Sequence, residues 1–403
     1  MGKQNVPEIR FENDVPWKRN RFGELYRKSD ERNNGQFGWN KTISIATMTW
    51  NETGNGAADS SLASYKVLRT GDIAFEGHTN KEFQFGRFVL NDIGDGITSS
   101  IFTILRPTTN QNIIFWKYLI HDEAVMRRKL VYSTKSGIMM NGLVVDDFMK
   151  QTIRFPSLPV QREIADLFSS LDRKLAAEQK KLAALKMAKH ALFVKIFPRE
   201  GETVPEIRFE GFSHPWEQRE AVDIADYSKG NGYSKSDLTE NGTPIILYGR
   251  LYTKYQFAID EVDTFATPKD GSIYSQGNEV IIPASGETAE DIARASAVEK
   301  SGILLGGDLN ILRPFNFINP LFLALTISNG EPQKDLAKKA QGKSVVHIHN
   351  SDIQEVTVSF PTRAEQDRIV AVFRSLDNLI TLHQRKCDKL RQAKSALLNQ
   401  MFV

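Results

Sequence analysis

The sequence predicts an α+β (mixed α/β) protein in which two globular domains are joined by a long antiparallel two-helix coiled coil. Three observations lead to this prediction. The chain repeats itself, a heptad pattern follows each copy, and the copies differ in length only between their matched ends. A chain of 403 residues, 40% hydrophobic and 25% charged, is large enough and apolar enough for two ordinary domains. We therefore expect an internal pseudo-two-fold repeat of domain and helix.

The duplication is clearest where each half begins. The sequence Pro-Glu-Ile-Arg-Phe-Glu occupies residues 7–12 and recurs letter for letter at residues 205–210, an offset of 198 residues (205 − 7). A Pro-Trp pair follows each copy, at Pro16-Trp17 and at Pro215-Trp216.

A second match lies where each domain ends. Phe155-Pro156 corresponds to Phe360-Pro361, an offset of 205 residues (360 − 155). Because this offset differs from the first, the insertions and deletions lie inside the globular parts. Beyond each Phe-Pro pair, Gln161, Ile164, Phe168, Leu171, Asp172, Leu185, Lys189, Leu192 and Phe197 agree with Gln366, Ile369, Phe373, Leu376, Asp377, Leu390, Lys394, Leu397 and Phe402.

Weaker similarities survive inside the domains. Gly71-Asp72-Ile73 resembles Gly277-Asn278-Glu279-Val280, and Ile104-Leu105-Arg106-Pro107 resembles Ile311-Leu312-Arg313-Pro314. A shared framework with diverged loops is typical of a scaffold that binds two different targets with one geometry. Strand-like and helix-like runs alternate within it. The strands expected are Thr42–Thr49, Ile245–Tyr248 and Glu279–Pro283, and the helices expected are Ile113–Ile120 and Leu321–Ser328.

A heptad pattern follows each domain, with seam positions at alternating spacings of four and three. In the first copy these positions are Ile164, Phe168, Leu171, Leu175, Glu178, Leu182, Leu185, Lys189, Leu192 and Ile196. In the second copy they are Ile369, Phe373, Leu376, Ile380, His383, Cys387, Leu390, Lys394, Leu397 and Met401. Pro159 and Pro198 mark the ends of the first helix. At about 1.5 Å per residue, each helix is roughly 50–55 Å long.

Two interpretations of these helices are open. Each could pack only on its own domain, but so long and narrow a stripe more naturally pairs with its copy. The second domain begins almost directly after the first helix, which favours an antiparallel pair. The polar seam residues, such as Lys189 and Lys394, either fix the register or mark places where the seam frays. The expected organisation is a first domain at 1–156, a central helix at 157–198, a linker at 199–212, a second domain at 213–360 and a C-terminal helix at 361–403.

The motif that ends each domain resembles a known family. Phe155-Pro156, Gln161-Arg162-Glu163-Ile164 and Leu171-Asp172 are similar to the repeated region of type I restriction–modification specificity (S) subunits. The same holds for the second copy and for the Pro-Glu-Ile-Arg-Phe openings, so that the resemblance covers nearly the whole chain.

The resemblance implies a subunit without catalytic activity that gives a restriction–modification complex its DNA sequence specificity. Two target recognition domains would each read half of a split site in double-stranded DNA, with the helices as a spacer. The implied partners are two methyltransferase (M) subunits, which use S-adenosylmethionine to methylate adenine at N6, and two restriction (R) subunits, which use ATP. This chain is expected to bind no cofactor itself.

Candidate DNA-binding residues lie in similar places in both halves, in a loop before each Phe-Pro pair. Small hydroxyl side chains, lysine and glycine suit a backbone that approaches phosphates or base edges. The alternative is a plain polar turn. The residues concerned are Ser133, Lys135, Ser136 and Gly137 in the first half, with Lys339, Gln341, Gly342, Lys343 and Ser344 in the second. Basic residues accompany both loops, Arg127, Arg128 and Lys129 beside the first, and Lys334 and Lys338 beside the second.

A further cluster in the second half mixes aromatic and cationic residues, a combination that can span a groove or pair with guanine. It comprises Tyr248, Arg250, Tyr252 and Lys254. The tyrosines could equally be half-buried strand residues. The glycine-rich segment 229–235, with Lys229, Tyr233 and Lys235, is a weaker candidate for the same role.

Several other functions are disfavoured. Residues 337–344 only partly match a phosphate-binding loop, because the leading glycine is missing and a strand-like run follows. His347 and His349 would share one face of that strand, but no third metal ligand is apparent nearby. Asn319-Pro320-Leu321-Phe322 lacks the second proline of an adenine methyltransferase motif. Two rival functions remain. One is a self-sufficient DNA methyltransferase or nuclease, which the missing motifs disfavour, and the other is a coiled-coil scaffold that binds proteins.

The cellular location is expected to be the cytoplasm. Cys387 is the only cysteine, so no intramolecular disulfide can form. The first residues lack the apolar stretch of a signal peptide, and no apolar run is long enough to span a bilayer.

Overall fold

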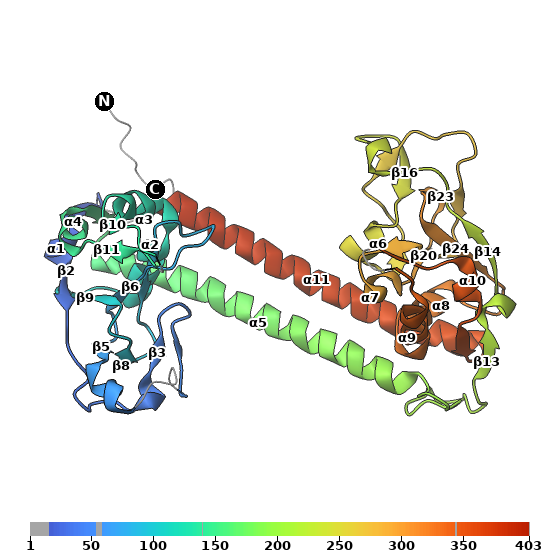
Figure 1. Cartoon of the computed structure of the whole chain (residues 1–403), viewed down its shortest axis with the longest axis horizontal. Coiled ribbons are helices and arrows are strands. Elements are labelled where there is room, and N and C mark those ends of the chain that lie inside the picture. Colours follow the sequence, from blue (N-terminus) through green and yellow to red (C-terminus); the bar gives the residue numbers. More distant parts are fainter. Residues whose placement is uncertain (1–15, 54–58, 139, 343–344, 403) are drawn as a thin grey trace. The chain divides into compact units, whose positions relative to one another are not determined.

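The computed structural model describes residues 16–53, 59–138, 140–342 and 345–402 (Figure 1). The chain divides into two compact units, one of residues 1–180 with 384–403 and one of residues 181–383. The two long helices, α5 (Leu158–Ile196) and α11 (Arg363–Met401), contribute to both units. Among the described residues, no helix is both long and apolar enough to cross a membrane.

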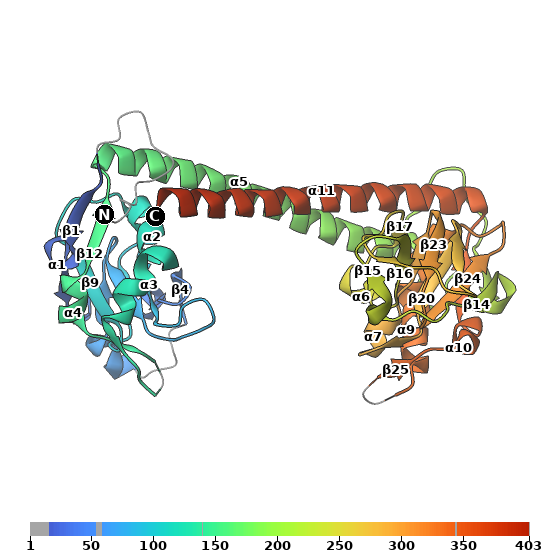
Figure 2. The ribbon, with the colours of Figure 1, turned by 90° about the horizontal axis from the view of Figure 1, so that it is seen from above.

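The first domain is built on a four-stranded antiparallel sheet with the strand order β2-β9-β6-β7. Its strands are β2 (Tyr26–Ser29), β6 (Ile73–Glu76), β7 (Arg87–Leu90) and β9 (Thr103–Pro107), and α2 (Ile113–His121) and α3 (Glu123–Val131) follow β9. A separate pair, β1 (Lys18–Arg21) and β12 (Thr152–Phe155), leads directly into α5 (Figure 2). The remaining elements are α1 (Phe22–Leu25), η1 (Trp39–Lys41), β3 (Ile43–Ser44), β4 (Thr49–Trp50), η2 (Asp59–Ser64), β5 (Lys66–Leu68), β8 (Gly96–Thr98), β10 (Thr134–Lys135), β11 (Gly142–Leu143) and α4 (Val145–Lys150).

The second domain is built on two five-stranded sheets. The first has the order β14-β24-β20-β22-β17, with β14 (Ala225–Lys229), β17 (Ala258–Ile259), β20 (Glu279–Pro283), β22 (Ser296–Val298) and β24 (Leu309–Pro314). The other has the order β15-β18-β16-β23-β19, with β15 (Leu238–Thr239), β16 (Thr243–Ile246), β18 (Phe265–Ala266), β19 (Tyr274–Gln276) and β23 (Ser301–Leu305). The remaining elements are β13 (Glu217–Glu220), η3 (Ala221–Asp223), η4 (Lys235–Asp237), α6 (Arg250–Thr253), β21 (Ser285–Gly286), α7 (Ala289–Ile292), α8 (Pro320–Ile327), α9 (Gly330–Lys339), β25 (Val346–His347), α10 (Asn350–Gln354) and β26 (Thr357–Phe360).

The two domains share one framework. In the first domain Ile73 of β6 lies opposite Leu105 of β9, and in the second Val280 of β20 lies opposite Leu312 of β24. Both pairs are separated by the same offset of 207 residues (280 − 73 and 312 − 105), so the sheet β2-β9-β6-β7 corresponds to β14-β24-β20-β22. The motif similarities seen in the sequence therefore mark equivalent strands.

The shared strands also carry equivalent buried charges. The Asp72 carboxylate accepts hydrogen bonds from the Arg106 guanidinium, the shortest at 2.9 Å. At the same place in the second domain, Glu279 Oε1 lies 3.5 Å from Arg313 Nε. Both carboxylates are fully buried, so each needs its arginine to offset the cost of desolvation.

The expected local elements are mostly confirmed. The helices at Ile113–Ile120 and Leu321–Ser328 correspond to α2 and α8, and the strand at Glu279–Pro283 is β20. The predicted strand Thr42–Thr49 is wrong as a single element, because the chain turns back between β3 and β4, with Met48 at a φ of 48°. The strand expected at Ile245–Tyr248 ends at Ile246, since the Leu247 carbonyl already accepts a hydrogen bond from the Arg250 N–H.

The glutamine of each Phe-Pro motif fastens its long helix to the domain. Gln366 is fully buried, and its Nε2 donates to the Pro361 carbonyl at 2.9 Å and to the Phe317 carbonyl at 3.0 Å. Its Oε1 accepts the backbone N–H of Asn319, the residue that caps α8, at 2.7 Å. Gln161 makes the equivalent bonds to Pro156 and Asn112. The motif is therefore a structural clamp.

The long helices run in opposite directions within each unit. In the first unit Lys394 of α11 pairs with Asp172 of α5 at 2.5 Å, and in the second unit Lys189 of α5 pairs with Asp377 of α11 at 2.6 Å. Each helix thus contributes one lysine and one aspartate. The two aspartates are 205 residues apart (377 − 172), and so are the two lysines (394 − 189), so the two ion pairs are equivalent under the repeat. The expected antiparallel helix pair is confirmed, and each of the two seam lysines pairs with an aspartate of the other helix.

The far end of each helix completes the core of the unit that it reaches. Phe402, at the end of α11, lies 6.3 Å from the ring of Trp17 and 5.7 Å from that of Phe115. Phe197, at the end of α5, lies 5.6 Å from the ring of Trp216 and also 5.6 Å from that of Phe322. The Pro-Trp openings noticed in the sequence are therefore the sites where these terminal phenylalanines dock.

The second copy of the repeated hexapeptide joins the two helices. Glu206 accepts from Lys195 at 2.6 Å, and Arg208 makes two 2.8 Å bonds to the buried carboxylate of Glu365. The first copy, residues 7–12, lies outside the described residues.

Burial along the helices follows the predicted heptads. Ile164, Phe168, Ile369 and Phe373 are buried at the domain ends. The other predicted apolar seam residues are buried or half-buried, namely Leu171, Leu175, Leu182, Leu185, Leu192, Leu376, Ile380, Leu390 and Leu397.

Candidate nucleic-acid interface

In each domain a hairpin follows the second of two consecutive helices, α3 in the first domain and α9 in the second. The two hairpins occupy the same place. In the first domain β10 pairs with β11, and the Asn141 N–H bonds the Gly77 carbonyl at the end of β6 at 2.8 Å. In the second domain Gln341 pairs with His347, and the Ile348 N–H bonds the Ala284 carbonyl beyond β20 at 3.1 Å. Both anchoring bonds are again 207 residues apart (348 − 141 and 284 − 77). The two loops singled out in the sequence are therefore equivalent structures.

Each hairpin closes around a glycine. A Cβ on Gly137 would lie 2.2 Å from the Met140 carbonyl oxygen, and one on Gly342 would lie 1.9 Å from that of Val345. Gly342 also has a φ of 137°, a conformation open mainly to glycine. Each glycine therefore stands where a side chain would clash with the backbone of its own hairpin.

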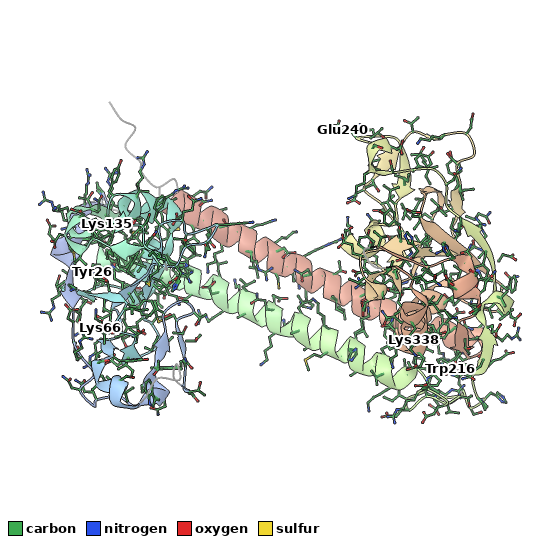
Figure 3. The ribbon with its side chains drawn as sticks, viewed as in Figure 1. Tyr26, Lys66, Lys135, Trp216, Glu240 and Lys338 are labelled. Carbon is green, nitrogen blue, oxygen red and sulfur yellow. The ribbon has the colours of Figure 1, made fainter. Side chains whose placement is uncertain are left out.

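In the first hairpin, Lys135 is exposed (Figure 3). Ser136 and Gly137 are exposed as well, and the neighbouring Ile138 is fully exposed. Ser133 is buried, and its hydroxyl donates to the Lys129 carbonyl at 2.7 Å, so that it ties the hairpin to α3.

The basic helix beside this hairpin presents two of its three cations. Arg127 and Arg128 are exposed on α3, where Arg127 donates to Gln84 Oε1 at 2.9 Å. Lys129 is half-buried, and burial lowers the pKa of its amino group.

In the second domain, the matching basic residues lie on α9 (Figure 3). Lys338 is exposed, while Lys339 pairs with Glu355 at 2.6 Å. Gln341 and Gly342 are exposed, whereas Lys343 and Ser344 lie outside the described residues.

The turn between β23 and β24, residues 306–308, brings the other predicted segments of the second domain together. The Asn231 N–H bonds the Leu305 carbonyl at 3.1 Å and the Gly230 N–H bonds the Leu309 carbonyl at 3.0 Å, so segment 229–235 lies against this turn. On its other side, the Ala284 N–H bonds the Asp308 carbonyl at 2.7 Å, and β21 then pairs with β25 of the hairpin. The hairpin and the glycine-rich segment therefore flank one turn.

A cavity of about 860 Å³ opens beside this turn. Two segments that lie apart in the sequence, 229–235 and 247–255, line it together. The predicted residues in its wall are Tyr233, Lys235, Tyr248, Arg250, Tyr252 and Lys254. Lys229 is exposed at the end of β14 and does not line the cavity.

Ion pairs order the cations of this cavity. Asp263 accepts from Lys254 at 2.5 Å and from Arg250 at 2.6 Å, and these bonds hold its pKa well below the usual range. The Lys269 ammonium, 2.6 Å from Asp237, lowers the pKa of that carboxyl to about 2. Tyr233 is buried beneath the cavity, with its hydroxyl 2.6 Å from that of Ser272. Lys235 and Lys254 are the exposed cations among the predicted residues of this wall.

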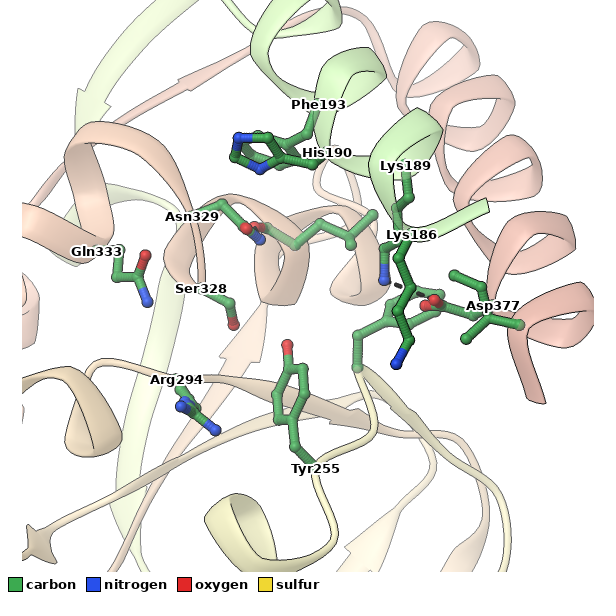
Figure 4. A pocket seen from close by; sticks show the side chains of 13 residues that line it. Lys186, Lys189, His190, Phe193, Tyr255, Arg294, Ser328, Asn329, Gln333 and Asp377 are labelled. Carbon is green, nitrogen blue, oxygen red and sulfur yellow. Dashed lines mark hydrogen bonds and ion pairs between the residues drawn. The ribbon is translucent and has the colours of Figure 1, made fainter. Parts of the chain in front are cut away.

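The Gly306-Gly307-Asp308 turn was not predicted from the sequence. Its signal was available, since a Gly-Gly-Asp triplet directly precedes the strand with the repeated Ile-Leu-Arg-Pro motif. Nor did the sequence predict a smaller pocket of about 360 Å³ between α5, α11 and the second domain, with Lys186, His190 and Arg294 in its wall (Figure 4). Leu325 of α8 lines this pocket, and the equivalent residue of α2 is Tyr118, whose hydroxyl donates to Asp172 in the first unit. Within the described ranges, no group of three His, Cys, Asp or Glu side chains is arranged to hold a metal ion.

Together, the duplicated domains, the paired helices and the exposed basic residues define a duplicated protein with a candidate nucleic-acid interface in each domain. Residues 22–187 and 213–392 match the model of the type I restriction modification DNA specificity domain, and the chain belongs to this family. It is thus the DNA specificity subunit of a type I restriction–modification system and is itself non-catalytic.

Known proteins agree with this assignment. The type I restriction enzyme MjaVIII specificity subunit of Methanocaldococcus jannaschii is 21% identical over 322 residues, covering 76% of this chain and 74% of the relative. The crystal structure of a type I restriction-modification S subunit from M. genitalium superposes with a TM-score of 0.61 at 13% identity, covering 99% of both chains. A chain from a structural study of type I complex assembly and conformational transition gives a TM-score of 0.53 at 16% identity, covering 98% of this chain and 99% of that one. These two structures share the fold.

Proposed function

We propose that residues 1–156 and 213–360 are two target recognition domains that read the two halves of a split DNA site. The helices at 157–198 and 361–403, with the linker at 199–212, would then set the unread spacer between the halves. The observation that carries this proposal is the repeated framework with unlike insertions. The segment between β2 and β6 forms short strand pairs, whereas the segment between β14 and β20 contributes most of a second sheet.

Each domain would approach DNA with its hairpin and the adjoining basic surface. Cations at these places neutralise phosphates and set the register on the duplex, while a few side chains select bases in the major groove. In the first domain the contacts would come from Arg127, Arg128, Lys135, Ser136 and Gly137, with Ser133 in support. In the second they would come from Lys229, Lys235, Tyr248, Arg250, Tyr252, Lys254, Lys339, Gln341, Gly342, Lys343 and Ser344, with Tyr233 in support. To contact DNA, Arg250 would have to break its ion pair with Asp263.

The chain would act in the cytoplasm with two methyltransferase subunits and two restriction subunits. The methyltransferase subunits would bring S-adenosylmethionine and the restriction subunits would use ATP. The resemblance of both Phe-Pro motifs to those of S subunits supports these partners.

Domain exchange tests the independence of the two readers. Replacing residues 213–359 with the corresponding segment of another specificity subunit should change one half of the methylated site and leave the other half and the spacer unchanged. The shared clamp at the domain ends makes such an exchange structurally feasible. Loss of both half-sites in a folded chimera would contradict two independent readers.

Helix length tests the spacer. Adding one heptad to each helix lengthens it by about 10 Å, which corresponds to roughly three base pairs at about 3.4 Å each. The spacer of the methylated site should grow accordingly. An unchanged spacer in an active variant would show that the helices do not measure it.

A further inference from the structure

Asp308 stands out in the wall of the second-domain cavity. It lies in the turn between β23 and β24, and its φ of 56° is in the left-handed region. Residues other than glycine adopt this conformation infrequently, and they concentrate at functional sites. The turn holds Asp308 in place through the 2.7 Å bond from the Ala284 N–H to its carbonyl.

Asp308 also differs from the other two carboxylates of the cavity. Asp237 is paired with Lys269, and Asp263 is paired with Arg250 and Lys254. Among the residues that the structure describes, the only side-chain partner of the Asp308 carboxylate is the Ser285 hydroxyl, at 3.3 Å. The carboxylate is exposed and keeps acceptor capacity for a ligand.

A carboxylate in this position is unsuited to DNA phosphates, which repel it. In the major groove, however, aspartate accepts a hydrogen bond from an exocyclic amino group, such as N4 of cytosine or N6 of adenine. We propose that Asp308 is a specificity-determining residue that accepts a hydrogen bond from one such amino group in the second half-site. This inference rests on the proposed function of the second domain as a DNA reader.

The equivalent position in the first domain supports a reading role. Counting back from the matched Ile104 and Ile311 places Ile101 at the position of Asp308, and the Ile101 side chain is 62% exposed. An exposed isoleucine next to DNA suits the methyl group of thymine. The shared framework thus presents two unlike side chains at one position, as two different half-sites require.

The test uses the full chain in complex with its methyltransferase subunit. Once the methylated site is known, binding is measured by fluorescence anisotropy on duplexes in which single bases lack their exocyclic amino group. Purine replaces adenine and 2-pyrimidinone replaces cytosine, one position at a time. With the native chain, one replacement in the second half-site should weaken binding about 5- to 100-fold, and the analogue that does so identifies the base.

Asp308→Gly removes the carboxylate and suits the left-handed backbone, so this variant should fold. It should bind the replaced and the native duplex equally while keeping full discrimination in the first half-site. Asp237→Asn, at a paired carboxylate in the same cavity, should retain the native pattern. If Asp308→Gly keeps the native sensitivity to every replacement, the inference is wrong while the proposed function stands. If the native complex prefers no split site, the proposed function itself fails.

Discussion

The two lysine–aspartate pairs between the helices offer a quantitative test of the helix register. The pair between Lys189 and Asp377 is suited to it, because its side chains are 29% and 27% exposed, between a surface pair and a buried one. Exposed pairs contribute about 0.2–1 kcal/mol, and breaking a buried pair costs about 3–5 kcal/mol. We therefore expect the loss of this pair to cost about 1 kcal/mol. In Lys189→Asp two negative charges also face each other, and their repulsion should cost a similar amount. This variant should therefore lose about 2 kcal/mol of unfolding free energy.

The measurement is a thermal unfolding series on Lys189→Asp, Asp377→Lys and the double variant. For a cooperative unit of roughly 200 residues, each 1 kcal/mol lowers Tm by about 2–4 °C, so each single variant should lose about 4–8 °C. The double variant restores opposite charges across the seam and should recover most of this loss. Lys180→Asp is the control, because Lys180 is exposed on α5 and no described residue forms an ion pair with it, and it should change Tm little. A double variant no more stable than the single variants would show that the two side chains do not set the register.

Three further predictions concern the clamp, the hairpin and the cavity. Gln366→Ala leaves buried backbone groups of Asn319 and Pro361 without partners, at about 1–3 kcal/mol each. It should lower Tm far more than Gln392→Ala, because Gln392 is exposed on the same helix. Gly137→Ala should weaken discrimination between bases in the first half-site alone. A Cβ at Gly142, in the same hairpin, meets nothing within 4 Å, so Gly142→Ala should leave this discrimination intact. Equal effects of the two variants in DNA-binding assays would argue against the hairpin as a reader. The pKa of Asp237, about 2, lies below the ordinary value of about 3.9, so its ion pair stabilises the cavity fully above about pH 4 and this contribution is lost as the pH falls toward 2. NMR titration should show the Asp237 pKa returning toward its ordinary value in Lys269→Met, and no rise would contradict the assigned ion pair.

Periodicity explains what the sequence revealed about the fold. The apolar seam of the helices, which includes Ile164 and Phe373, repeats every seven residues over a long stretch. A single polar residue in the seam therefore does not hide the pattern. The run from Thr42 to Thr49 shows why short strands are harder, because alternating apolar residues continue through a turn at Met48 that sequence pattern does not reveal.

The candidate interface was only partly predictable because long-range contacts build it. The sequence identified both segments that line the large cavity, but their meeting depends on the turn at residues 306–308. Likewise, Lys189 was recognisable as an unusual seam residue, yet its partner Asp377 lies 188 residues away. Local pattern indicates which side chains are unusual, whereas the tertiary fold decides what they face.

The most direct test of a two-domain DNA reader is the methylation pattern that the chain directs. Single-molecule sequencing of DNA from cells that carry this chain and its methyltransferase subunit would reveal every modified adenine. Two short specific halves separated by a spacer of fixed length and free sequence are the predicted result. A continuous methylated motif, or modification that does not depend on this chain, would contradict the account.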